Sequence, residues 1–136
     1  MKSLCYHCAT SGVCQFGIIE QIFDDQPSRS HGRIRCPPNF QGLPGMVHGG
    51  WIAAVFDDFM GRQAWTLGEF VHTTSLTIDF IKPAPVGPEL HFSVFAQPLE
   101  TRTWRADAEL RVAETSLLVA KATGRFVQPR RRGGET

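Results

Sequence analysis

Asp57 is the residue of this 136-residue chain that is best placed to do chemistry. It lies in the mostly apolar run of residues 47–61, with no basic side chain three or four positions away. At helical spacing it shares a face with small residues such as Ala53 and Gly61. An unpaired carboxylate there is costly unless it meets water, a hydrogen-bond donor or a ligand. Asp57 is therefore a candidate general base or nucleophile. The alternative is a structural carboxylate that a backbone N–H elsewhere satisfies.

The neighbouring carboxylate, Asp58, has a partner within the same helix turn because Arg62 follows it by four residues. Such a pair stabilises a helix by about 0.2–0.5 kcal/mol. We expect an Asp58–Arg62 ion pair, and contact with a bound substrate is the further role considered for Asp58.

Two glycines, Gly49 and Gly50, precede this run and are expected to open the helix. The first N–H groups of a helix have no intrahelical partner and carry the positive end of the helix dipole. Without a Cβ on either residue, a carbonyl oxygen or an oxyanion can approach these donors closely. Both glycines are candidate contacts for a substrate carbonyl, and a plain turn is the alternative.

The distance between the donors and the carboxylate limits how they can act together. Gly49 and Asp57 are eight residues apart, which is about 12 Å along a helix axis. One helix cannot bring both groups to the same carbonyl carbon. Two copies related by a two-fold axis can, so we expect a site that combines Gly49 of one chain with Asp57 of another.

The motif formed by His48, Gly49 and Gly50, with Asp57 nine positions after the histidine, resembles that of hotdog-fold acyl-CoA thioesterases of the PaaI type. Residues 73–85 resemble the strand that follows the helix in that family. The similarity extends over residues 5–127.

This resemblance implies an enzyme that hydrolyses acyl-CoA to a carboxylic acid and free coenzyme A, without a cofactor or catalytic metal. It implies a homodimer or a homotetramer. It also implies that Thr73 positions the attacking water, and that Gln41 lies in a loop at the substrate. His48 is either a general acid or base, or a residue whose ring holds the loop before the helix by a backbone hydrogen bond. The family favours the second role.

Two other functions remain open at this point. A hotdog hydratase or dehydratase would need a catalytic histidine, for which His48 is the well-placed candidate, but the acidic partner patterns expected there are missing. A non-catalytic acyl-CoA-binding module is the other, and the retained Asp57 argues mildly against it. Large side chains near the helix are candidates for an acyl or aryl pocket, or for the core: Trp51, Phe59, Met60 and Trp65.

The cysteines near the start of the chain suggest a different site. Cys5 and Cys8 form a C-x-x-C pair, and His7 or Cys14 are further candidate zinc ligands. A second C-x-x-C or a paired histidine motif is missing. We therefore expect no metal, with zinc at these residues as the alternative.

The pattern of apolar residues predicts two strands, one long helix and then four strands. The first two strands are expected at residues 15–24 and 30–36. The last three begin near Leu90, Trp104 and Leu118 and form an antiparallel meander. This order is an α+β plan, in which a curved antiparallel sheet wraps around one central helix, the hotdog fold that the resemblance also implies.

Residues 70–81 are expected to form a long strand with strict alternation. In this prediction Leu76, Ile78 and Phe80 face the core. Thr73 faces away, on the side of Ser75, Thr77 and Asp79. The helix itself is expected to be covered on both of its faces.

Length and composition agree with one domain over residues 1–128, of which 1–13 are the cysteine-containing segment, followed by a mobile basic tail at 129–136. The formal net charge of +1 gives no general attraction to nucleic acid. No apolar run is long enough to span a bilayer, and the first residues lack a secretory signal, so the expected location is the cytoplasm.

Overall fold

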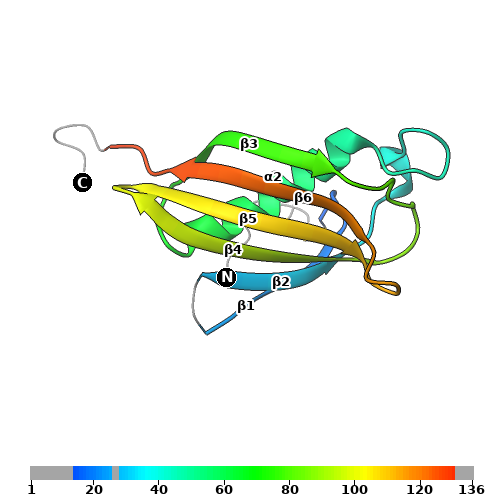
Figure 1. The fold of residues 1–136 in the computed structure, drawn as a ribbon, viewed down its shortest axis with the longest axis horizontal. Helices are drawn as coiled ribbons and strands as arrows, with labels where there is room; N and C mark the ends of the chain where they lie inside the picture. Colours follow the sequence, from blue (N-terminus) through cyan, green and yellow to red (C-terminus); the bar gives the residue numbers. More distant parts are fainter. Residues whose placement is uncertain (1–13, 26–27, 131–136) are drawn as a thin grey trace.

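The computed structural model describes residues 14–25 and 28–130. Within these residues, six strands form one antiparallel sheet and a single long helix, α2 (Gly49–Trp65), packs on one of its faces (Figure 1). The strands are β1 (Ile18–Phe23), β2 (Arg29–Ile34), β3 (His72–Phe80), β4 (Leu90–Glu100), β5 (Thr103–Val112) and β6 (Leu118–Val127).

The strands lie in the order β1-β2-β4-β5-β6-β3, so β1 and β3 are the two edges of the sheet. Three of them, β4, β5 and β6, follow one another with short turns as the predicted meander. The chain leaves β2, forms α2 across the sheet face and returns as β3 beside β6. The predicted α+β order of two strands, one helix and four strands is confirmed.

The core lies between α2 and the inner face of the sheet. Val55, Phe56 and Phe59 of the helix are fully buried, as the helical spacing predicts. The Phe59 ring stacks on Phe92 of β4, with centroids 4.1 Å apart and an interplanar angle of 3°. Burial of such large apolar side chains contributes about 1.5–3 kcal/mol each and fixes the helix on the sheet.

The opposite stripe of α2 differs from the prediction that both faces of the helix are covered. Gly50 and Asp57 are exposed, and Ala53, Ala54 and Gly61 are only partly buried. Small side chains therefore line an open face of the helix rather than a second packed layer of the same chain.

The prediction for β3 is wrong at Thr73 because a β-bulge interrupts the alternation. Thr73 pairs with Phe126, and Ser75 pairs with the next residue, Arg125, so Thr74 is the extra residue. Phe126 is a core residue, which places Thr73 on the helix side of the sheet. A one-residue shift changes the face of a side chain, and this bulge returns Thr73 to the face of Asp57.

The prediction is also wrong in part at the other end of β3. Phe80 lies in register with the buried Ala120, on the helix side of the sheet, but its side chain is 58% exposed. Within residues 14–25 and 28–130, β3 pairs with β6 alone, so its other edge has no neighbouring strand there.

The candidate zinc ligands Cys5, His7 and Cys8 lie outside the described residues, as does the tail beyond Arg130. Of that cysteine group, Cys14 is described and is a free thiol. In the part of the chain that the structure covers, no helix combines the length and apolar character that crossing a membrane requires.

Candidate active site

The loop before α2 is held at several points, and this fixes where the helix begins. The His48 N–H donates to the carbonyl of Phe40 at 2.8 Å, and the Val47 N–H donates to that of Ala84 at 2.9 Å. Gly45 takes a positive φ of 81°, the conformation that glycine adopts most readily, at the turn of this loop. The start of α2 is therefore tied to η1 (Pro38–Phe40) and to the segment after β3.

His48 is the N-cap of α2, and its Nδ1 accepts a hydrogen bond from the Gly50 N–H at 2.8 Å. The predicted backbone hydrogen bond of the His48 ring is confirmed. The N–H groups of Trp51 and Ile52 donate to the His48 carbonyl at 3.0 and 3.3 Å. Within the described residues, the Gly49 N–H is the donor of this first turn that has no partner. Gly50 is close to the site, but its N–H is already engaged.

Asp57 is exposed and accepts a hydrogen bond from the Thr73 hydroxyl at 2.5 Å on Oδ1. This hydrogen bond joins the middle of α2 to the start of β3. It can form because the bulge turns the Thr73 side chain toward the helix. The Thr73 hydroxyl has one proton to donate, and it donates it to Oδ1, which orients the carboxylate. The other oxygen, Oδ2, makes no hydrogen bond within the described part of the chain.

Asp58 forms the predicted ion pair with Arg62, 3.2 Å from Oδ2 to a guanidinium nitrogen, and both side chains are mostly buried. Burial raises the pKa of the Asp58 carboxyl above its ordinary value, the Arg62 charge opposes the rise, and the nearby Asp57 charge adds to it. The two adjacent carboxylates therefore differ: Asp58 is paired and shielded, whereas Asp57 is open to a ligand.

Gln41 uses both ends of its amide inside its own loop. Its Nε2 donates to the Pro38 carbonyl at 3.0 Å, and its Oε1 accepts from the Gly45 N–H at 2.9 Å. This side chain braces the loop that positions His48 and the helix start.

The two halves of the predicted site lie at opposite ends of β3. Thr73, at the start of the strand, bonds to Asp57. Phe80, at its end, lies beside the helix start, because a Cβ added to Gly49 would be 3.5 Å from the Phe80 ring. The sequence pattern did not identify Phe80 as a neighbour of Gly49, since alternation alone assigned it to the core.

A cleft of about 410 Å³ opens next to Asp57, between the C-terminal half of α2 and the start of β3. Its lining combines polar and apolar residues from both elements and from Phe126 of β6: Asp57, Asp58, Gly61, Arg62, Trp65, Val71, His72, Thr73 and Phe126. Of the four large side chains proposed for a pocket, only Trp65 lines this cleft; Trp51, Phe59 and Met60 are buried in the core.

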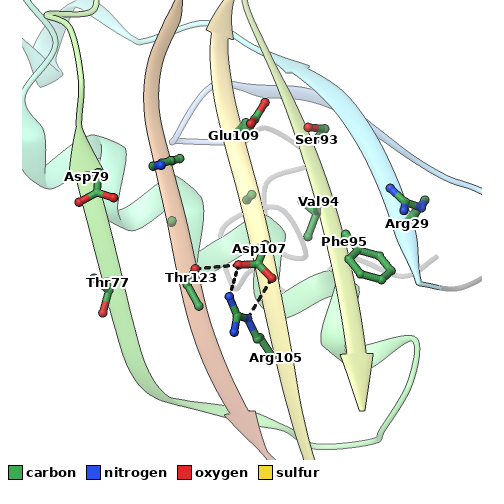
Figure 2. Close-up of a pocket in the computed structure, with 13 residues that line it drawn as sticks. Arg29, Thr77, Asp79, Ser93, Val94, Phe95, Arg105, Asp107, Glu109 and Thr123 are labelled. Carbon is green, nitrogen blue, oxygen red and sulfur yellow. Dashed lines mark hydrogen bonds and ion pairs between the residues drawn. The ribbon is translucent and has the colours of Figure 1, made fainter. Parts of the chain in front are cut away.

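A second hollow, of about 550 Å³, lies on the outer face of the sheet, away from α2 (Figure 2). Its central carboxylate, Asp107, accepts two hydrogen bonds from Arg105 at 3.0 and 3.1 Å and one from Thr123 at 2.7 Å. Partial burial raises the pKa of Asp107, but these hydrogen bonds outweigh it and the net pKa is lowered. A carboxylate that already accepts three hydrogen bonds in this way is a poor candidate for a general base.

The sequence profile of the thioesterase superfamily matches residues 44–119, which contain α2, β3, β4 and β5. The chain belongs to the thioesterase superfamily. Among curated relatives of this superfamily member, acyl-coenzyme A thioesterase THEM4 of Xenopus laevis is 32% identical over 91 residues, 67% of this chain and 41% of the relative. The chain thus spans about two fifths of that protein's length.

Solved structures establish the fold of this thioesterase-superfamily chain. The E. coli PaaI protein superposes with a TM-score of 0.71 and 19% identity, covering 82% of this chain and 79% of that one. The Streptococcus mutans protein smu.793, solved with acetyl-CoA bound, gives a TM-score of 0.71 and 20% identity, covering 85% and 90%. The predicted hotdog fold is confirmed.

Proposed function

We propose that this chain hydrolyses acyl-CoA thioesters at sites that two copies of the chain share. The observation that carries the proposal is that the two candidate groups, Asp57 and the Gly49 N–H, lie beside opposite ends of the edge strand β3. Asp57 is tied to the start of β3 through Thr73, and Gly49 lies beside its end at Phe80.

Antiparallel pairing of two β3 strands about a two-fold axis would bring these halves together. The start of one strand would then lie next to the end of the other, so Asp57 of one copy would meet Gly49 of its partner. The unpaired edge of β3 and the exposed Phe80 support such an interface. A homodimer would contain two sites, and a homotetramer built from two such dimers would keep both.

The chemistry follows from the two groups. The Gly49 N–H would donate to the thioester carbonyl oxygen and stabilise the negative charge that develops there, aided by the helix dipole. Asp57 would take a proton from water as the water oxygen bonds to the carbonyl carbon. The C–S bond then breaks, coenzyme A leaves as a thiolate that gains a proton, and the acid is released. Direct attack by Asp57 would give a mixed anhydride that water then hydrolyses.

The other predicted residues have supporting roles in this proposal. Thr73 orients the carboxylate through its hydroxyl. His48 and Gln41 hold the helix start and leave the Gly49 N–H available to a substrate. Asp58 stays paired with Arg62 at the side of the substrate cleft. The Nδ1 atom of His48 accepts a hydrogen bond from the Gly50 N–H and is not free to accept a proton. This engagement disfavours the hydratase or dehydratase alternative, which needs a catalytic histidine.

The names of the curated relatives support the proposed activity, since the one described above is called an acyl-coenzyme A thioesterase. The acetyl-CoA bound to smu.793 supports coenzyme A thioesters as the ligand class. The remaining alternative is a module that binds acyl-CoA and leaves it intact.

A panel of acyl-CoAs with a thiol reagent tests the proposal on wild type and on Asp57→Asn. We expect free coenzyme A from wild type, and a loss of about 10²–10⁴-fold in kcat/KM for Asp57→Asn with the fold retained. Asp58→Asn should lose far less, and Asp25→Asn, on the exposed β1–β2 connection, should match wild type. Binding without release of coenzyme A would support the binding module, and wild-type turnover by Asp57→Asn would exclude both roles of Asp57.

A further inference from the structure

The cleft beside Asp57 has a defined direction. Asp57, Gly61 and Trp65 follow one another at intervals of four residues, and therefore form one ridge along α2. Gly61 and Trp65 lie about 6 and about 12 Å from Asp57 along the helix axis. The cleft therefore extends from the carboxylate toward the end of the helix, away from Gly49.

Gly61 has no side chain and therefore leaves a gap in this ridge between Asp57 and Trp65. Glycine is unfavourable inside a helix, so its presence calls for a local reason. Packing does not supply one, because a Cβ at this position would lie 3.8 Å from the Phe126 ring, an ordinary contact. A longer side chain would instead extend between Asp57 and Trp65 and occupy the cleft.

The far end of the cleft is lined by Trp65, whose side chain is held by two contacts. The Trp65 Nε1–H donates to the Val71 carbonyl at 3.0 Å, and its ring meets that of Phe70 edge-on with centroids 5.2 Å apart. Val71 and Phe126, which also line the cleft, are buried. An acyl chain entering past Asp57 would meet these apolar side chains before it reached the Trp65 ring.

We infer that Gly61 determines the size of the acyl group, and that the cleft takes a medium-length or aryl acyl group that crosses Gly61 and ends against Trp65. This inference rests on the proposed function, since it requires the thioester carbon to lie at Asp57. The apolar part of the lining is an indole, a phenyl ring and a valine, which match an apolar acyl body, while Asp58, Arg62 and His72 line the rest of the cleft. Straight chains much longer than the distance from Asp57 to Trp65 would extend past Trp65.

Gly61→Ala and Gly61→Leu test the inference as a graded series, because both residues favour the helix more than glycine does. The probes are acetyl-, butyryl-, octanoyl-, lauroyl- and benzoyl-CoA. The octanoyl-to-acetyl ratio of kcat/KM should fall roughly tenfold or more in Gly61→Leu, and less in Gly61→Ala. Ala113→Leu, which introduces the same side chain at the β5–β6 turn, away from the cleft, should keep the wild-type profile. An unchanged profile in Gly61→Leu would overturn the inference.

Calorimetry separates a failure of this inference from a failure of the proposed hydrolysis. If wild type releases no coenzyme A from any probe, the proposed hydrolysis fails, but binding still tests the cleft. Wild type should then bind octanoyl-CoA roughly tenfold or more tightly than coenzyme A, and Gly61→Leu should abolish the difference. Equal binding of the two ligands by wild type, or an undiminished difference in Gly61→Leu, would refute the role of Gly61.

Discussion

Gly49 carries the most specific claim about a single residue. Its N–H is the donor of the first helical turn that has no partner among the described residues, while the N–H of Gly50 is held by His48. The proposed contribution of Gly49 is therefore one backbone N–H donor rather than a side chain. The claim is testable by a substitution that removes the N–H donor, with a second variant that keeps the donor but adds a Cβ.

Gly49→Pro is that substitution. Proline has no N–H and is favoured at the first position of a helix, which Gly49 occupies. The preceding residue, His48, already has the extended conformation that proline requires before it, with φ −66° and ψ 133°. We expect the helix to form normally and kcat to fall by about 10²–10³-fold, the loss typical of one oxyanion donor.

Gly49→Ala is the matched control, because it keeps the N–H and its Cβ meets Phe80 only at an ordinary contact distance of 3.5 Å. Its added Cβ narrows the approach to the N–H, so it should lose some activity, but clearly less than Gly49→Pro, which lacks the donor. Circular dichroism and thermal unfolding would show whether both variants are folded. Equal kinetics for Gly49→Pro and Gly49→Ala would argue against the N–H as a catalytic group.

The sequence alone was sufficient to single out Asp57 as a candidate, because an unpaired carboxylate in an apolar run is unusual. For Gly49 and Gly50 the sequence alone favoured a plain helix-entry turn, and the family resemblance added support for the role in binding the carbonyl. The sequence alone was also not sufficient for Thr73, which the family resemblance supplied, since threonine is common in any strand. Phe80 was missed as a neighbour of Gly49. The exposure of Phe80 depends on β3 being an edge strand, and the local sequence pattern does not indicate which strands lie at the edges.

At the scale of the element, the start of α2 depends on an unusual cap. A histidine ring accepts from the Gly50 N–H, where serine, threonine, asparagine and aspartate are more common. The contact requires a glycine at position 50, because a Cβ there would come within 2.9 Å of His48 Nδ1. In the proposed mechanism His48 is therefore a positioning residue, which holds the turn that contains Gly49.

Substitutions of His48 separate this role from acid–base catalysis. His48→Ala should lower the free energy of unfolding by about 1 kcal/mol, whereas His48→Asn, which can also cap, should restore most of it. Turnover should follow the cap, so that the Asn variant stays close to wild type with an unchanged pH profile. Denaturant unfolding and steady-state kinetics measure the two effects. An Asn variant that is stable but as inactive as Asp57→Asn would indicate a catalytic histidine.

The bulge in β3 shows where element prediction failed. Period-two alternation located the strand and the inward side of Leu76 and Ile78, but it placed Thr73 on the wrong face. Inserting one extra residue, Thr74, reverses every side chain before it. The sequence here contains no glycine to mark the irregularity, so the bulge could be recognised only from the pairing with β6.

At the scale of the molecule, β3 is an edge strand with an exposed aromatic residue at its end. An unpaired edge of this kind invites pairing with another chain. In the proposed homodimer each Phe80 ring is buried beside the partner's site, so association and activity should be lost together.

Phe80→Lys tests this coupling. Two Phe80 rings per dimer, each contributing about 2 kcal/mol on burial, imply that dimerisation should weaken roughly a hundredfold or more. Sedimentation should then detect monomer, and activity should recover as protein concentration rises. Leu117→Lys removes another exposed apolar side chain, near the β5–β6 turn, and should change neither property. An inactive Phe80→Lys that remains fully dimeric would separate the two effects and contradict the coupling.

The fold as a whole was the most predictable level. The periodicity of apolar residues predicted two strands, a helix with one buried stripe and a three-strand meander. What periodicity could not give was the open side of α2. Small residues are compatible with close packing inside one chain and equally with a face reserved for a ligand or a second copy.

Mixing two inactive variants is the most direct test of the shared site. Asp57→Asn and Gly49→Pro are each expected to be nearly inactive, but in a mixed dimer one site combines an intact Asp57 with an intact Gly49. After subunit exchange of equal amounts, about half of the dimers are mixed and about a quarter of the wild-type sites should be restored. Activity that stays at the level of the separate variants, although exchange is complete, would show that each site lies within one chain.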